Sequence, residues 1–144
     1  MCPAAPSLDH ARPRSGDGNP LHLDADYART TVFQRPIVHG MLVASLFSSI
    51  FASNLPGSIY LSQTLKFKGP VFIGEHVTAT ITVLSCRQLR GGTKVATCRT
   101  QCEVTQGLPA ADAGLLGATK AGRLALEGAA EVLCPMAKLS HGSG

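Results

Sequence analysis

The chain has 144 residues, of which 44% are hydrophobic and 15% are charged, and its net charge is +4. This length predicts one domain of ordinary size, and the hydrophobic fraction is sufficient for a packed core, which excludes wholesale disorder. Six basic residues and one acid lie between residues 66 and 99, but no long basic run or interleaving with aromatic residues accompanies them. We therefore expect no nucleic-acid partner.

The cysteines and the apolar stretches indicate the cellular environment. The most apolar stretch, Ile37–Ala52, carries a histidine and three serines and is too short to span a bilayer, so a soluble protein is expected. No C-x-x-C pair occurs, and the histidines lie far from the cysteines, so the sequence predicts no zinc framework. The cysteines are interpreted as reduced, mostly buried thiols of an intracellular protein of the cytoplasm or mitochondrion: Cys2, Cys86, Cys98, Cys102 and Cys134.

The first segments of the chain are poor in regular structure. Residues 1–14 contain three prolines and no apolar block, which predicts a disordered N-terminal segment. Loop and short helix are predicted from Ser15 to Arg35, with turn-forming residues at Asp17–Pro20. Asp24 is a suitable N-cap for a short helix through Tyr27 and Ala28.

A long helix is predicted next. Pro36 and the pair Pro56-Gly57 bracket residues 37–55, and proline is favourable in a first helical turn whereas Pro-Gly ends a helix. Apolar residues nearly surround the axis of this segment, so we expect the helix to be buried on most sides.

The remainder of the chain changes to the period of β-strands. Gly91-Gly92 predicts a hairpin between the second and third strands, and residues 106–122 form a Gly/Ala-rich loop insertion. The predicted fold is α+β, with a curved antiparallel sheet wrapped around one long central helix. Its domain spans residues 15–136, followed by a flexible tail at 137–144. Because an open sheet of this size has a free edge, we expect a homodimer. The predicted strands are 58–68, 76–84, 94–105 and 124–134.

The segment from Ser15 to Asp24 holds the first candidate for chemistry. Asp17 and His22 are separated by a Gly-Asn-Pro turn, which lets the two side chains converge on one point. A histidine and a carboxylate that converge on a water molecule form a general acid/base pair. The alternative is that Asp17 and Asn19 only cap a turn and His22 is partly exposed.

The start of the long helix holds the second candidate. Gly40 lies in the first turn, where a backbone N–H has no partner within the helix and the missing side chain permits close approach of a ligand oxygen. Such an amide can stabilise the oxyanion of a thioester enolate. The alternative is that Gly40 only relieves a tight contact and His39 is an ordinary residue at a helix start.

Four blocks together resemble one family, the MaoC-like, (R)-specific enoyl-CoA hydratases of the hotdog fold. Their order and spacing match over roughly residues 15–104, and residues 128–135 resemble the closing strand. Four ordered blocks are a far more specific signal than the Asp-x-Asn-Pro-x-His motif alone. The blocks are Asp17–His22, Pro36–Met41, Gly57–Gln63 and Phe67–Glu75.

The resemblance implies reversible addition of water to a trans-2-enoyl thioester to give an (R)-3-hydroxyacyl thioester. It implies Asp17 and His22 as the catalytic pair and the Gly40 amide as the oxyanion donor. The implied oxyanion and substrate-binding group also includes His39 and Asn19, of which Asn19 holds the turn. The substrate is carried by CoA or by acyl carrier protein, and no metal or redox cofactor is expected.

The resemblance leaves alternatives. A 3-hydroxyacyl-ACP dehydratase would have the same residues, and a non-catalytic hotdog subunit that binds acyl thioesters is a further alternative. Family members usually begin with a β-strand, but only sixteen residues precede Asp17 and residues 1–14 lack the alternation of a strand. We therefore expect the first strand to be missing, and the chain to be less stable and more prone to aggregation than a version extended by such a strand.

Overall fold

The computed structural model describes residues 15–109 and 119–135. The predictions of a disordered segment at 1–14 and a flexible tail at 137–144 lie outside the described residues, as does the middle of the insertion predicted at 106–122. The chain divides into two compact parts, residues 1–37 and 38–144, and each is described by itself.

The first part contains two short helices, α1 (Pro20–Leu23) and α2 (Ala25–Arg29). The carboxylate of Asp24 accepts hydrogen bonds from the backbone N–H groups of Asp26 and Tyr27, which confirms the predicted N-cap of α2. The sequence did not predict α1, which forms because the Asn19 side chain caps it and proline occupies its first position.

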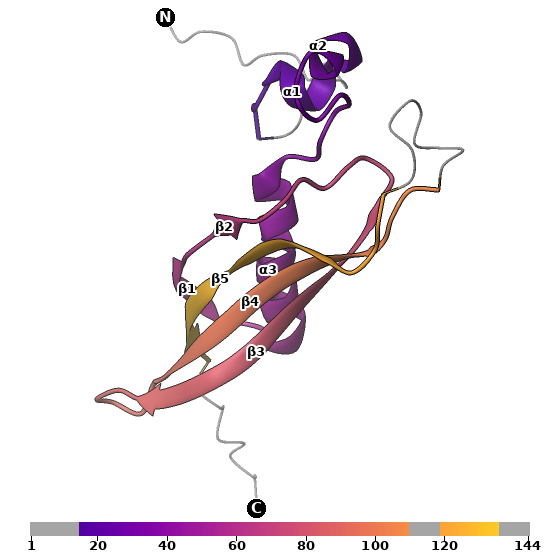
Figure 1. Ribbon diagram of the computed structural model, residues 1–144. Coiled ribbons are helices and arrows are strands. Elements are labelled where there is room, and N and C mark those ends of the chain that lie inside the picture. The colour runs from indigo at the N-terminus through magenta and orange to yellow at the C-terminus, as the bar shows by residue number, and fades with distance from the viewer. Residues whose placement is uncertain (1–14, 110–118, 136–144) are drawn as a thin grey trace, which may run out of the picture. The chain divides into compact units, whose positions relative to one another are not determined.

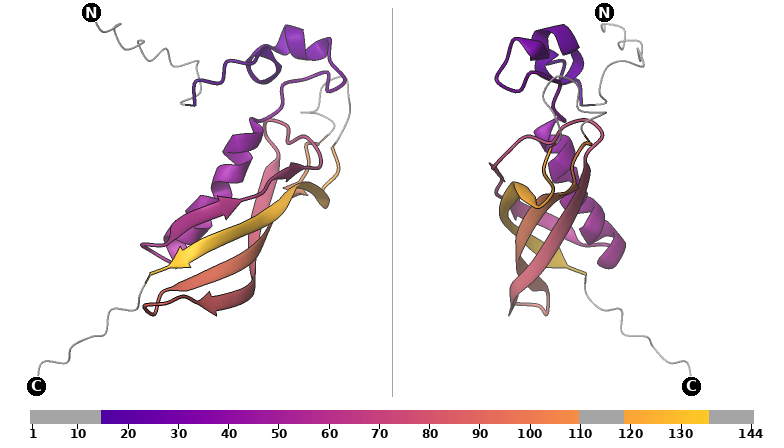
Figure 2. Two further views of the ribbon diagram at one scale, coloured as in Figure 1. Left: turned by 90° about the vertical axis from the view of Figure 1, so that its left-hand side faces the viewer. Right: turned by 45° about the vertical axis from the view of Figure 1, so that its right-hand side comes forward.

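The second part places one helix against one face of an antiparallel sheet (Figures 1 and 2). The helix is α3 (Gly40–Asn54), which begins three residues later than predicted. Its sheet has the strand order β1-β5-β4-β3, with the two-residue strand β2 also paired to β5. The strands are β1 (Ile59–Gln63), β2 (Lys66–Phe67), β3 (His76–Gln88), β4 (Lys94–Gln106) and β5 (Arg123–Cys134).

The helix is less buried than the sequence predicted. Val43, Phe47 and Phe51 are its buried residues, and they share one face because they are spaced by four. Met41 and Leu42 are 66% and 61% exposed. The sheet of one chain covers a single face of α3, so the prediction of burial on most sides is wrong for the single chain.

Strand β3 extends four residues beyond the predicted end at Leu84. A register shift between Val83 and Ser85 interrupts the alternation of apolar and polar residues, and pairing with β4 resumes beyond it. A bulge of this kind moves later side chains to the other face, so hydrophobic periodicity cannot detect the strand on its far side. The predicted hairpin at Gly91-Gly92 is confirmed, and both glycines have φ of 86°.

The segment predicted as one strand over 58–68 is two strands, β1 and β2, both paired to β5. Ile59, Leu61 and Phe67 alternate with polar residues in this segment, yet each is more than half exposed. Tyr60 instead packs its ring edge-to-face against Phe51, with the ring centroids 5.2 Å apart. The alternation correctly indicated strands but not which face the helix covers.

The break between β1 and β2 depends on close backbone contact with β5. Gly128 lies under this break, and a Cβ atom on it would stand 1.8 Å from the carbonyl oxygen of Thr64. The Thr64 N–H and hydroxyl also bond to the backbone of Ala129, which fixes the segment in place. Only glycine permits this approach without displacement of the backbone.

We expect Gly128→Ala to lower the free energy of unfolding by about 1–3 kcal/mol, because the added methyl group meets backbone rather than a flexible side chain. Thermal melting followed by circular dichroism measures the effect. Gly18→Ala is the matched control, since a Cβ there meets nothing within 4 Å. Equal melting temperatures for the two variants would contradict the assignment of this close contact.

The core lies between α3 and the inner face of the sheet. The even-numbered residues of β4 from Ala96 to Val104 are buried in it, including the free thiols of Cys98 and Cys102. Burial raises the pKa of both thiols, so they remain protonated and pack as small apolar groups. Thr100 is the buried polar member, and it accepts a hydrogen bond from the Gln63 amide at 2.9 Å. Among the helices of the described ranges, none is long and apolar enough to cross a membrane.

Candidate active site

The loop that begins at Asp17 is held by its own side chains. The Asp17 carboxylate accepts the N–H of Asn19 at 3.1 Å, and the Asn19 side chain accepts the N–H of Leu21 at 3.1 Å. The backbone N–H of His22 donates to the carbonyl of Asn19 at 3.0 Å. These three bonds turn the chain sharply between residues 17 and 22, because Asx side chains replace backbone partners in tight turns.

The ring of His22 is held in a defined orientation. Its Nδ1 lies 2.8 Å from the carbonyl oxygen of Ile37, and the side chain is 11% exposed. A carbonyl oxygen only accepts, so Nδ1 carries the proton and donates it to Ile37. In the neutral imidazole Nε2 is then unprotonated and can act as a base.

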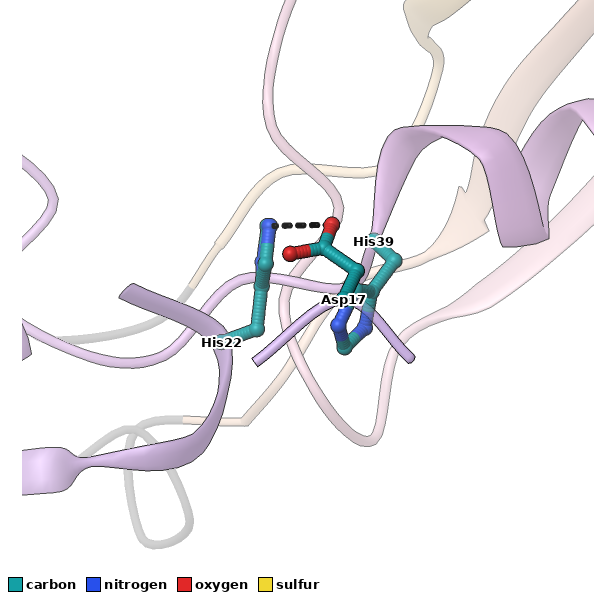
Figure 3. A group of neighbouring side chains, drawn as sticks. All are labelled: Asp17, His22 and His39. Carbon is teal, nitrogen blue, oxygen red and sulfur yellow. Dashed lines mark ion pairs between the residues drawn. The ribbon is translucent and has the colours of Figure 1, made fainter. Parts of the chain in front are cut away.

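The structure brings Asp17 and His22 together, with Nε2 of His22 4.0 Å from Oδ2 of Asp17 (Figure 3). The Asp17 side chain is half exposed. The separation exceeds a direct hydrogen bond, and a water oxygen can lie about 2.8 Å from both atoms. Both atoms accept, so such a water would direct its two protons at the pair and its lone pairs away from them. This arrangement suits activation of a water nucleophile.

The other two predicted site residues belong to the second part of the chain. Gly40 is the first residue of α3, where no residue four positions earlier lies within the helix to accept its N–H. His39 is the N-cap residue and makes no side-chain capping bond to the amides of α3. His39 therefore does not neutralise the positive end of the helix dipole through a capping bond.

Gly40 also has a close neighbour that is distant in the sequence. A Cβ atom on Gly40 would stand 2.5 Å from Cε1 of Phe67, so the aromatic ring occupies the space left by the missing side chain. Phe67 follows the β1–β2 break, whose position depends on pairing with β5. Nothing in the local sequence indicates that these two residues meet.

An apolar groove of about 300 Å³ lies beside the exposed side of α3 and ends on β1 and the residues after it. The small side chains of Ala44, Ser45 and Ser48 line its α3 side, which leaves room for an unbranched chain. The lining residues are Met41, Ala44, Ser45, Ser48, Tyr60, Gln63 and Leu65.

Comparison with known proteins gives consistent matches. A family model described as "MaoC like domain" matches residues 12–105. The (R)-specific enoyl-CoA hydratase of Aeromonas caviae is 59% identical over 76 residues, which cover 51% of this chain and 57% of that protein. A mitochondrial 3-hydroxyacyl-[acyl-carrier-protein] dehydratase of Solanum lycopersicum is 51% identical over 74 residues, which cover 51% of this chain and 45% of that protein.

Solved structures agree with the sequence matches. The structure of an (R)-hydratase from A. caviae involved in PHA biosynthesis has a TM-score of 0.63 and 46% sequence identity to this chain. That match covers 84% of this chain and 80% of that chain. The sequence matches above span about half the length of the two curated relatives.

Proposed function

This chain belongs to the MaoC-like domain family, and from that premise we propose that it catalyses the reversible hydration of trans-2-enoyl thioesters to (R)-3-hydroxyacyl thioesters. The observation that carries the proposal is the pairing of Asp17 and His22, whose facing atoms are 4.0 Å apart and both accept hydrogen bonds. This pair can hold and activate a water molecule.

In the proposed reaction, the water between Asp17 and His22 attacks the β-carbon of the enoyl thioester. One of the two residues accepts a proton from this water as the new C–O bond forms, and the electrons of the C=C bond move onto the thioester oxygen. The resulting enolate collapses when the α-carbon takes up a proton from the pair. Water is thereby added across the double bond, with no change in oxidation state overall.

The enolate requires a hydrogen-bond donor, and we assign this role to the Gly40 amide. A backbone N–H at the first residue of a helix, reinforced by the helix dipole, stabilises negative charge that develops only during the reaction. His39 adjoins this amide as the N-cap residue of α3, and we assign it to substrate binding. Asn19 supports the pair by capping α1 and holding the turn between residues 17 and 22.

The groove beside α3 is the proposed site for the acyl chain. It begins at Met41, next to Gly40, so a thioester whose oxygen meets the Gly40 amide can direct its chain along the helix. The lining is mainly apolar, which favours a hydrocarbon over a charged substituent.

The carrier of the acyl group is either CoA or acyl carrier protein. The relative from S. lycopersicum is a dehydratase of acyl-carrier-protein thioesters, which supports the second carrier as an alternative. Both carriers present the same thioester to the same residues, so the proposed chemistry holds for either.

We propose that the protein acts as a homodimer in a reducing compartment, the cytoplasm or mitochondrion. Strand β3 pairs with β4 on one side and is the last strand of the sheet in the described residues. Val83 and Leu84 are more than half exposed on it, and a second copy would cover them. The four described cysteines are free thiols, which fits a reducing environment.

The first test follows the enoyl absorbance of crotonyl-CoA while free thiol is measured in the same sample. We expect the absorbance to fall without release of CoA, because hydration consumes the double bond and leaves the thioester intact. Release of thiol in proportion to the absorbance loss would indicate a thioesterase. A folded protein that changes neither crotonyl-CoA nor the corresponding acyl-carrier-protein substrate would support the non-catalytic subunit.

A further inference from the structure

One ion pair of the second part is more enclosed than the others. The Glu75 side chain has no exposed surface, and its partner Arg123, the first residue of β5, is 27% exposed. The other ion pairs among the described residues of that part, Lys68–Glu127 and Arg87–Glu131, join side chains that are 35–58% exposed. Exposed pairs contribute little to stability, whereas removal of one partner of an enclosed pair leaves a buried charge uncompensated.

Arg123 holds both ends of the segment that leads from β2 to β3. Its Nη1 donates to the carbonyl of Pro70, and its Nη2 donates to the carboxylate of Glu75. The same carboxylate oxygen accepts the N–H of Phe72 at 2.9 Å, and the Arg123 guanidinium lies 5.7 Å from the centre of the Phe72 ring. The planar fork of arginine can make these two bonds together, which a lysine ammonium does not reproduce.

Val71 lies between these anchored ends. Its side chain is 6% exposed within the core, and its carbonyl oxygen accepts the backbone N–H of Val38 at 2.7 Å. Val38 stands two residues before Gly40. The segment 70–75 therefore fixes the chain at the point where it enters α3, and with it the direction of the first amides of the helix.

The carboxylate of Glu75 is charged at neutral pH. Burial raises its pKa, but hydrogen bonds involving Thr119, Phe72 and Arg123 and the charge of Arg123 outweigh this effect and hold the pKa below its ordinary value. The interaction is therefore present at neutral pH and is lost only as the pH falls through that lowered pKa.

We propose that Arg123 and Glu75 are positioning residues, which hold segment 70–75 against Val38 and thereby aim the Gly40 amide at the thioester oxygen. The effect on catalysis rests on the proposed function. The positioning of Val38 rests on the structure alone. A misplacement of about 1 Å at a reacting group can cost about 100-fold in rate, so the effect on turnover is expected to be large.

The experiment compares Arg123→Lys with the wild-type chain. The lysine keeps a positive charge beside Glu75 but cannot bond to Pro70 and Glu75 in the same fork. Hydrogen exchange resolved at the Val38 amide is expected to be at least about tenfold faster in the variant, because its bond to Val71 is less well held. The kcat with crotonyl-CoA should fall by about tenfold to 100-fold, with KM changed by less than about twofold.

The controls separate positioning from a loss of charge or of folding. Arg87→Gln removes the Arg87–Glu131 pair, 3.6 Å apart on the same sheet, and should change neither exchange at Val38 nor kcat. Glu75→Gln, which keeps the shape of the side chain, replaces Arg123→Lys if circular dichroism shows the lysine variant to be unfolded.

The outcomes are distinguishable from failure of the proposed function. Unchanged exchange at Val38 overturns the proposal, and so does faster exchange with unchanged kcat in an active protein. If the wild-type chain hydrates neither the CoA nor the acyl-carrier-protein substrate, the proposed function fails, and faster exchange at Val38 still supports the positioning of the helix start by Arg123 and Glu75.

Discussion

Replacement of Asp17 by asparagine or of His22 by glutamine is expected to lower the hydration rate by about 10²–10⁴-fold each. Asparagine keeps the side-chain oxygen that accepts the N–H of Asn19, and glutamine keeps the approximate size and polarity of the imidazole, so the local fold should survive. What each variant loses is a group that can accept and return a proton. Initial rates with crotonyl-CoA and circular dichroism of the same preparation measure the two properties.

The rate losses of the two single variants should not multiply in the double variant. Both residues act on one water molecule, so loss of either already removes most of the proton transfer. Asp26→Asn is the matched control, since this carboxylate is 89% exposed on α2 and pairs with Arg29. A folded Asp17→Asn or His22→Gln protein that keeps more than about a tenth of the wild-type turnover would remove that residue from the proposed pair.

Replacement of Gly40 by proline is expected to lower kcat by about 10²–10³-fold, because proline has no N–H to donate to the enolate. Proline is tolerated at the first position of a helix, and His39 already has a ψ of 125°, which suits the residue before a proline. Gly40→Ala is the comparison, since it adds a side chain and keeps the N–H.

The ring of Phe67 complicates both Gly40 variants. A Cβ atom at residue 40 would stand 2.5 Å from this ring, which is 55% exposed and can turn aside. Both variants are therefore also made with Phe67→Leu, which removes most of the crowding. If the folded proline and alanine variants have the same kcat in that background, the Gly40 amide is not the oxyanion donor.

Local patterns predicted most of the second part of the chain. Alternation located strands β4 and β5 to within one residue at each end. The register shift in their pairing, between Cys102 and Glu103, lies near the end of β4 and the start of β5, so most of each strand keeps its alternation. The prolines around residues 37–55 located α3 but predicted its first residue three positions too early. A proline marks where a helix is allowed to begin and not where it does begin. The capped helix α2 was likewise predictable from Asp24.

The features that the sequence did not reveal depend on contacts between distant residues. Two close contacts form only when β1 and β2 pair with β5. They are the contact of Gly128 with Thr64 and that of Gly40 with Phe67. Arg123 and Glu75 lie 48 residues apart, and no local pattern distinguishes them from exposed charges. The motif identified the residues of the candidate pair, whereas the 4.0 Å separation and the orientation of the His22 ring came from the folded loop.

The configuration of the product formed from crotonyl-CoA tests the central claim most directly. The purified chain is incubated with crotonyl-CoA, and the 3-hydroxybutyryl-CoA that forms is resolved by chiral chromatography, with His22→Gln as the parallel sample. The proposed function predicts that the (R)-enantiomer accumulates with the wild-type chain and that its rate of formation falls at least about 100-fold with the variant. Formation of the (S)-enantiomer, or equal rates for the two proteins, would contradict it.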